Sequence, residues 1–281
     1  MITFQKGTKL VIDNGVNRYQ LLVGSATASQ TYVESSQKVK TIHNPNIVER
    51  TFVNEKGTSN LTFSCYVGDG ITESSIFEWF GFSESTGTYV IDPNINTLQT
   101  VDIYIDAGNT IYKLDTCVGQ NISFKLSRKE ALMLEVTGVA SDLITVSSIP
   151  SITYAQDSSK FYNDTIDITN FSNIAEVTCE ITRTINWLGQ KSVHDTLSGN
   201  IYKQKNPVLA SMAISGSITQ NKVDNTNVYN NSTPVQIKYG STFEINLTAC
   251  NTTDRWDMSS IHQKTTDYKL LPTAVSSYIK F

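Results

Sequence analysis

Hydrophobic and polar residues alternate along much of this chain, and two of the alternating stretches resemble each other. Residues 101–117 read VDIYIDAGNTIYKLDTC, and residues 235–250 read VQIKYGSTFEINLTAC. Each stretch holds an alternating run, a turn of small or polar residues and a second alternating run that ends in Leu-x-x-Cys. Alternation with a period of two, broken at a turn that contains glycine, predicts a β-hairpin. The sequence therefore predicts the same hairpin twice.

The resemblance extends to the residues that precede the two hairpins. LTFSCYV at 61–67 and MAISGSI at 212–218 place small and apolar residues on one face of a strand, with an offset of 212 − 61 = 151. The same offset carries His43 to His194. At the closing cysteines of the hairpins the offset is 250 − 117 = 133, so the second copy is shorter by 18 residues in between.

A fourth landmark follows each hairpin. The pattern L-x-x-T-x-V occurs at 134–139 and again at 270–275. Four landmarks in the same order predict two copies of one β-rich module, at residues 1–150 and 151–281. Each copy would have an ordinary size for a domain with its own core.

Polar, charged stretches interrupt the alternation once in each copy, at 36–60 and at 188–207. Both contain proline and glycine, and neither could lie in a core without burying unpaired charges. We therefore expect two exposed arms. A leg of about ten extended residues reaches roughly 30 Å, which is far enough to contact another subunit.

Helical periodicity is clear only in ITESSIFEWFGF, residues 71–82. Ile76, Phe77 and Phe80 form an apolar stripe there, and Thr72 is a candidate N-cap. Because the second copy lacks this stretch, we expect the helix to pack on the outside of the first module only. The stretch SRKEALMLEV that follows residue 126 is predicted to be a turn and then a strand.

Composition narrows the class of protein. The chain of 281 residues is 39% hydrophobic and 17% charged, which suits a folded, strand-rich protein. A net charge of −4 disfavours electrostatic binding of nucleic acid. The first ten residues contain no apolar leader, and no stretch approaches the roughly 18 apolar residues of a membrane span. We therefore expect a soluble protein made in a reducing cytoplasm.

Candidate chemistry is sparse. The phosphate-loop, nucleophile-elbow and HExxH patterns do not occur. The four cysteines lie far apart in strand patterns, which indicates buried free thiols and not a metal site. Asp254 and Asp257 could mimic the carboxylate pair of a glycosidase, but the sequence does not fix their separation. The sequence predicts no enzyme, no metal and no cofactor.

The order of these elements resembles the tail tube proteins of long-tailed bacteriophages, of the siphophage type in which the tube domain is duplicated in one chain. The resemblance covers an arm ending in VERTFVNEKGTSNLTFSCYVGD, the helical IFEWFGF and the hairpin strand YKLDTCVGQNISFKLS. It continues through AEVTCEITRTINWL, the second arm and LASMAISGSITQN. The resemblance implies two tandem tube-type domains of β-sandwich form, whose inner sheets join those of their neighbours into a closed barrel.

The resemblance also implies partners and a location. Three duplicated chains would form a pseudo-hexameric ring, and stacked rings would surround a lumen through which DNA passes without sequence-specific binding. Tail tip or baseplate proteins, a tail terminator and a tape measure protein in the lumen are the other expected partners. The protein would be assembled in the host cytoplasm and reside in the virion tail. The residues expected to contact another ring or subunit are His43, Asn44, Glu49, Arg50, His194, Asp195 and Lys203.

Three alternatives stay open. A distal tail or baseplate hub protein would share the fold and the ring-forming logic, and would differ in its copy number in the particle. A tandem carbohydrate-binding module would use the tryptophans Trp79, Trp187 and Trp256 and remain monomeric. A hydrolase with a carboxylate pair is the weakest of the three.

Overall fold

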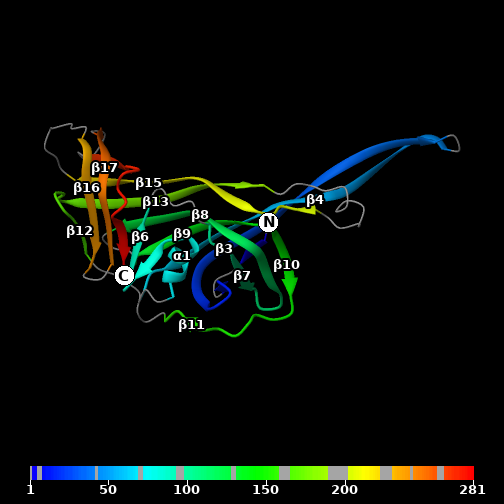
Figure 1. The fold of residues 1–281 in the computed structure, drawn as a ribbon, viewed down its shortest axis with the longest axis horizontal. Helices are drawn as coiled ribbons and strands as arrows, with labels where there is room; N and C mark the ends of the chain where they lie inside the picture. The colour runs from blue at the N-terminus through cyan, green and yellow to red at the C-terminus, as the bar shows by residue number, and fades with distance from the viewer. Residues whose placement is uncertain are drawn as a thin grey trace.

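Strands make up nearly the whole of the described structure (Figure 1). This computed structural model describes residues 2–4, 8–41, 44–68, 72–92, 98–127, 131–157, 165–188, 202–221, 230–240, 243–257 and 263–281, with the backbone alone at 2–4, 33–41, 44–54, 127, 202, 231 and 257. The prediction of a mainly β fold with one short helix is confirmed.

The elements of the first half are β1 (Ile2–Phe4), β2 (Lys9–Asp13), β3 (Arg18–Thr41), β4 (Asn44–Tyr66), α1 (Ser74–Trp79), β5 (Ser83–Ser85), β6 (Thr88–Ile91), β7 (Val101–Asp106), β8 (Ile111–Ser127), β9 (Met133–Ala140) and β10 (Asp142–Val146). Those of the second half are β11 (Tyr154–Ala155), β12 (Ile166–Ile168), β13 (Ile174–Trp187), β14 (Tyr202–Lys203), β15 (Pro207–Asn221), β16 (Asn230–Tyr239), β17 (Phe243–Asp257), β18 (Gln263–Leu270) and β19 (Ser277–Lys280). Both predicted hairpins are present, as β7–β8 and β16–β17.

Six strands of the first half close into a barrel. β2 pairs with β3, β3 with β4, β4 with β9, β9 with β8 and β8 with β7, and β7 returns to β2. The alternation that predicts these strands fills the barrel, since Leu61, Phe63 and Cys65 on one face of β4 are at most 1% exposed. Closure removes the unpaired strand edges that an open sheet presents.

The second half repeats the strand order of the barrel but stays open. Its order β12–β16–β17–β18–β15–β13 corresponds to β2–β7–β8–β9–β4–β3. β19 lies beside β17 as β10 lies beside β8. Within the described residues β12 pairs with β16, and β13 pairs with β15 and β8, so the ring of strands is not closed between β12 and β13. The boundary between residues 150 and 151 stays a prediction.

The two halves share one sheet and one hydrophobic core. Beyond its pairing with β7, the long strand β8 pairs antiparallel with β13 over residues 121–127 and 176–182. Buried side chains of both halves form a single cluster, in which the rings of Phe124 and Phe243 pack in a tilted arrangement with centroids 5.9 Å apart. The junction is therefore built from strand pairing and aromatic packing.

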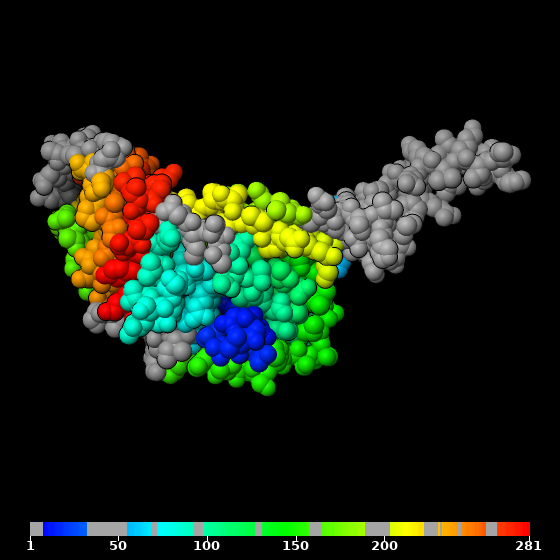
Figure 2. Space-filling model, viewed as in Figure 1, coloured from blue at the N-terminus to red at the C-terminus, as the bar shows by residue number. Residues whose placement is uncertain are grey.

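The predicted position of the helix is wrong. α1 is shorter than expected, its N-cap is Glu73, and no side chain caps it. Instead of lying outside the first half, α1 packs at the junction of the halves, where Phe77 lies 5.2 Å from the Phe281 ring and 6.0 Å from the Phe124 ring. The strand β6 that follows pairs with β19, as Figure 2 shows where the red C-terminal strand meets the cyan segment.

The fourth landmark of the repeat is displaced. Val118 of β8 lies opposite Val139, and its hairpin counterpart Asn251, at 118 + 133, lies opposite Lys269. β9 and β18 therefore correspond with an offset of 269 − 139 = 130, not the 136 that relates residues 134–139 to 270–275. The strand pairing thus excludes that match, and residues 271–276 follow the end of β18.

The match between LTFSCYV and MAISGSI is displaced as well. Leu61 lies opposite Gly138 of β9, and Gly216 lies opposite Tyr268, the counterpart of Gly138 at 138 + 130. The structural partner of Leu61 is therefore Gly216, not Met212. In both halves a large residue lies opposite a glycine. The glycine is on β9 in the first half and on β15, the counterpart of β4, in the second half.

Candidate assembly interface

A long β-hairpin forms the most prominent projection of the molecule. β3 and β4 pair from Val23–Cys65 near the barrel to Thr41–Asn44 at the far end, and Figure 1 shows this arm extending well beyond the body. The prediction of a projecting arm at 36–60 is confirmed for its backbone. Of the second predicted arm, residues 189–201 lie outside the described residues.

The described end of the second arm returns along the base of the first. β14 pairs in parallel with β4, with Tyr202 opposite Glu55 and Lys203 opposite Lys56. Gln204 Nε2 donates a 2.8 Å hydrogen bond to the Glu55 carboxylate. The two arms therefore meet at their bases instead of leaving the body separately.

Alternating lysines and aspartates hold this meeting point together. Asp142 is contacted by Lys56 Nζ at 2.8 Å and by Lys203 Nζ at 3.4 Å. Lys203 lies 3.6 Å from Asp115, which is 3.2 Å from Lys113 Nζ. We call these residues, with Asp102 at 2.7 Å from Lys113, the arm-base ion cluster. It joins five strands, namely β4, β7, β8, β10 and β14.

Within this cluster, Lys113 and Asp115 each stabilise the charged form of the other. Partial burial acts against the charge of Lys113, but hydrogen bonds and Coulombic attraction from Asp102 and Asp115 outweigh it and raise the pKa of the lysine. For Asp115, partial burial raises the pKa, and the hydrogen bond and charge of Lys113 outweigh it, so the net pKa is lowered. Lys113 and Asp115 therefore stay ionised at neutral pH. The contribution of Asp115 to stability is lost only as the pH falls through its lowered pKa.

The predicted contact residues lie mostly on the arms. Asn44, Glu49 and Arg50 are on β4, opposite residues 41, 38 and 37 of β3, and their side chains are not described. His43, His194 and Asp195 lie outside the described residues. Lys203 pairs with Asp115 and Asp142 of its own chain, so the structure gives it an intrachain role. Contact of any of these residues with another subunit stays a prediction.

Sequence reasoning missed a buried cation beside the junction. Arg183 on β13 is 1% exposed, and its three guanidinium nitrogens have no hydrogen-bond partner among the described residues. Its guanidinium carbon lies 5.3 Å from the centroid of the Phe80 ring. Burial lowers the pKa of Arg183 to about 10. Periodicity marks position 183 as inward-facing, but only the structure shows that its charge is not paired there.

Two strand edges of the sheet differ in how they are covered. β17 pairs with β16 as far as Thr252, and beyond it residues 253–257 pair with β18 on one side only, within the described residues. The edge of β3 at Ala26–Ala28 is paired with β1. An unpaired strand edge is a template for pairing with another chain.

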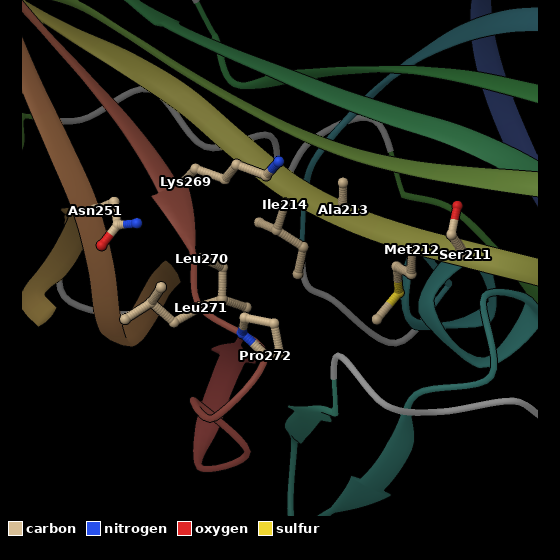
Figure 3. Close-up of a pocket in the computed structure, with 9 residues that line it drawn as sticks. All are labelled: Ser211, Met212, Ala213, Ile214, Asn251, Lys269, Leu270, Leu271 and Pro272. Carbon is tan, nitrogen blue, oxygen red and sulfur yellow. The ribbon is translucent and has the colours of Figure 1, made fainter. Parts of the chain in front are cut away.

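A pocket of about 490 Å³ lies beside β15, the long strand that follows the second arm (Figure 3). Met212 and Ile214 of β15 line one side, and Leu270, Leu271 and Pro272 line the other. Asn251 closes it, and its side-chain oxygen has no hydrogen-bond partner within the described part of the chain. The pocket is mainly apolar and carries no side chains arranged for catalysis.

The remaining candidates for chemistry have structural roles. All four cysteines are buried and free, as predicted. Trp79 is 1% exposed and donates a 2.9 Å hydrogen bond to the Cys117 carbonyl, so it belongs to the core. Asp254 lies 2.6 Å from Lys264 Nζ, which makes it an ion-pair partner. Among the described residues, no group of three His, Cys, Asp or Glu side chains could hold a metal ion, and no helix there is suited to cross a bilayer.

The described residues form a closed barrel, an open repeat of it, a projecting arm and an unpaired strand edge. Comparison with known proteins gives the family. Residues 3–281 match the model of the Bacteriophage Baseplate Tube Protein Family, and the chain belongs to that family. It is therefore a structural tail or baseplate tube component of a phage virion. No curated protein matches the chain.

Proposed function

We propose that three copies of this chain form a pseudo-sixfold ring, and that such rings stack into a tube around a lumen for DNA. The observation that carries the proposal is the β8–β13 pairing, which places two halves of equal strand order side by side in one sheet. Head-to-tail contacts that close make rings, and closure pairs every strand edge. In this proposal residues 1–150 and 151–281 are the two tube domains, and the siphophage major tail protein is the relative implied by the sequence.

The electrostatics and the arms suit this role. An overall charge of −4 keeps the protein from binding DNA phosphates tightly, so a genome could slide through the lumen. The arm extends far enough from the body to contact the next ring, with the predicted residues Glu49 and Arg50 on its β4 leg. Tail tip, terminator and tape measure proteins would be the other partners, met during assembly in the host cytoplasm.

Negative-stain electron microscopy across a concentration series tests the proposal. Rings or hollow tubes with threefold class averages are the expected result. Monodisperse monomers at every concentration, with or without purified tail-tip components, would refute it.

The family description also favours a second candidate, a single hub ring in the baseplate. Copy number in the particle separates the two, since a tube contains many rings and a hub contains one.

An arm truncation adds a structural test. Ser36 and Thr51 lie opposite each other, so an Asn-Gly turn can replace residues 37–50 without changing the register below. The truncated protein should form single rings that do not stack, and stacking as efficient as that of the full chain would exclude the arm as the inter-ring contact.

A further inference from the structure

We propose that the β17 edge of one copy pairs antiparallel with the β3 edge of a second copy, in the register that the chain itself uses between β8 and β13, and that β1 covers this β3 edge until the second copy displaces it. This inference rests on the proposed ring and deepens it. It names the two edges, their register and a strand that restrains assembly.

The template is the junction inside the chain. Over residues 121–126 of β8 and 177–182 of β13, apolar side chains face the core and polar side chains face outward. Phe124 lies opposite Cys179 in this ladder. On the outer face the Asn121 side chain donates a hydrogen bond to Glu180, and Lys125 Nζ lies 3.3 Å from Glu176.

Strand pairing gives the residues that correspond in the other half. Ile122 lies opposite Val136, and Asp254 lies opposite Thr266, which is 136 + 130, so this part of β8 maps to β17 with an offset of 254 − 122 = 132. The offset between β8 and β17 is 133 before residue 119 and 132 after residue 121. It falls by one because β8 has a register shift between residues 119 and 121, whereas the β17–β18 ladder has none.

The same reasoning maps β13 onto β3. Ala28 lies opposite Leu61, and Cys179 lies opposite Gly216, so the offset is 179 − 28 = 151. The bulged residues near Gly57 are on β4, so this offset holds along β3 itself.

Carrying the internal register across these offsets pairs Trp256 of one copy with Ala28 of the other, as Phe124 pairs with Cys179. An aromatic residue faces a small one in both junctions, so the two ladders share the same cross-strand pattern. The neighbouring rung pairs Arg255 with Ser29, on the outer face, as Ser123 pairs with Glu180.

Exposure supports the mapping. Tyr32 is the β3 counterpart of Arg183, at 32 + 151, and both belong to the inward-facing set of their strands. Arg183, which is covered by the other half of its own chain, is 1% exposed, whereas Tyr32 is 53% exposed. A large side chain left open at a position that is buried in the repeat indicates that a second molecule covers it.

β1 occupies the same edge in the single chain. Its residues Ile2, Thr3 and Phe4 pair antiparallel with Ala28, Thr27 and Ala26. β8 runs antiparallel to β13 in the same way, so β1 takes the place and direction that β17 of a second copy would take. The two strands compete for Ala26–Ala28, and assembly requires β1 to leave.

A second contact of the internal junction points to the pocket in Figure 3. In the chain, β14 of the second arm lies along β4 at Glu55 and Lys56. Glu55 and Lys56 lie opposite Val33 and Tyr32 of β3. The β13 counterparts of these two, Thr184 and Arg183, lie opposite Ser211 and Met212. Ser211 and Met212 are therefore the β15 counterparts of Glu55 and Lys56. Both residues line the pocket. The β4 leg of the second copy's arm would therefore lie over it.

Cysteine cross-linking in the full-length protein tests the register. The variant S29C/R255C places thiols on a directly opposed outward rung, and S29C/T253C is the matched control two residues away on the same face. Directly opposed positions allow the Cβ separation of a disulfide, and diagonal ones do not. The four native thiols are buried and give a low background. S29C/R255C should yield oxidised dimers and trimers at least several-fold faster than the control, with unchanged circular dichroism.

A variant lacking residues 2–4 tests the covering strand. Loss of a three-residue strand removes the backbone pairing that competes with assembly, so half-assembly should occur at a roughly tenfold lower concentration, and cross-linking should accelerate similarly. Unchanged assembly of this variant would overturn the role of β1.

The outcomes separate this inference from the proposed ring. Rings in the microscope without preferential S29C/R255C cross-linking would refute these edges and leave the ring in place. Neither rings nor cross-links, even without β1, would refute both.

Discussion

The unpaired charge of Arg183 makes a sharp prediction about stability. Replacing it with methionine keeps a long, flexible side chain of similar reach and removes the charge from the core. Arg183→Met should therefore stabilise the isolated chain, unlike most substitutions at buried positions.

The magnitude follows from two opposing contributions. Burial lowers the pKa of Arg183 from that of an exposed arginine to about 10, which corresponds to a cost of about 3 kcal/mol at about 1.36 kcal/mol per pH unit. The Phe80 ring, 5.3 Å away, returns about 1–2 kcal/mol through its interaction with the cation. We expect a net stabilisation of about 1–2 kcal/mol in the variant.

Urea unfolding at pH 7 measures this difference through the transition midpoint, at an unchanged slope. The pH dependence gives an independent signature. The pKa of Arg183 is lower in the folded chain than in the unfolded chain, so above a pH of about 10 the Arg183 side chain holds its proton more in the unfolded chain. The wild type therefore gains stability relative to the variant as the pH rises above about 10. Arg255→Met, at an exposed position of the same sheet, is the control; it removes an ion pair with Asp267 and should not be stabilised. A loss of more than about 1 kcal/mol in Arg183→Met would refute the reasoning, since removing the partner of a paired buried charge is strongly destabilising.

Three further outcomes are expected. Gly216→Ala should lose about 1–3 kcal/mol in urea unfolding, because a Cβ there would overlap the Thr178 carbonyl oxygen; wild-type stability would contradict the close approach. Asp142→Asn should lose about 1–3 kcal/mol by leaving Lys56 without its carboxylate, and the loss should shrink in high salt. The native cysteines should resist a thiol reagent at pH 8 until urea unfolds the chain, since burial raises the pKa of Cys179 and Cys250 to about 12.

The sequence predicts the strands well because alternation reports which face is buried. Both hairpins, the barrel strand at 61–67 and the four buried thiols are where the pattern indicates. The alignment of the two copies is less accurate, with errors of four residues at LTFSCYV and six at residues 134–139. Both errors are even numbers, and a strand shifted by an even number keeps every side chain on its face. Alternation alone cannot detect such a shift, and only the paired ladder does.

The helix and the ion cluster show a different limit. The apolar stripe of α1 predicts burial, but not against which half, because the contacts to Phe124 and Phe281 join residues far apart in the chain. The arm-base ion cluster likewise brings Lys56, Asp142 and Lys203 together from three separate strands. Neither arrangement has a local pattern, so each depends on the topology of the whole sheet.

The asymmetry between the halves has a consequence for how a ring would come apart. Inside the chain, the β8–β13 ladder is reinforced by α1, by the β6–β19 pairing and by the connector, where Gln156 donates to the Tyr66 carbonyl at 2.7 Å. The helix and β5–β6 belong to the first half alone, so the proposed β17–β3 junction between copies would lack these reinforcements. Two junctions of the same register would then differ in strength, with the internal one permanent and the other reversible.

Dilution or mild denaturant should dissociate rings into intact chains well before either half unfolds. Light scattering would report the loss of rings, and near-ultraviolet circular dichroism of the aromatic junction would report unfolding. A single coincident transition would show that the junctions are equally strong.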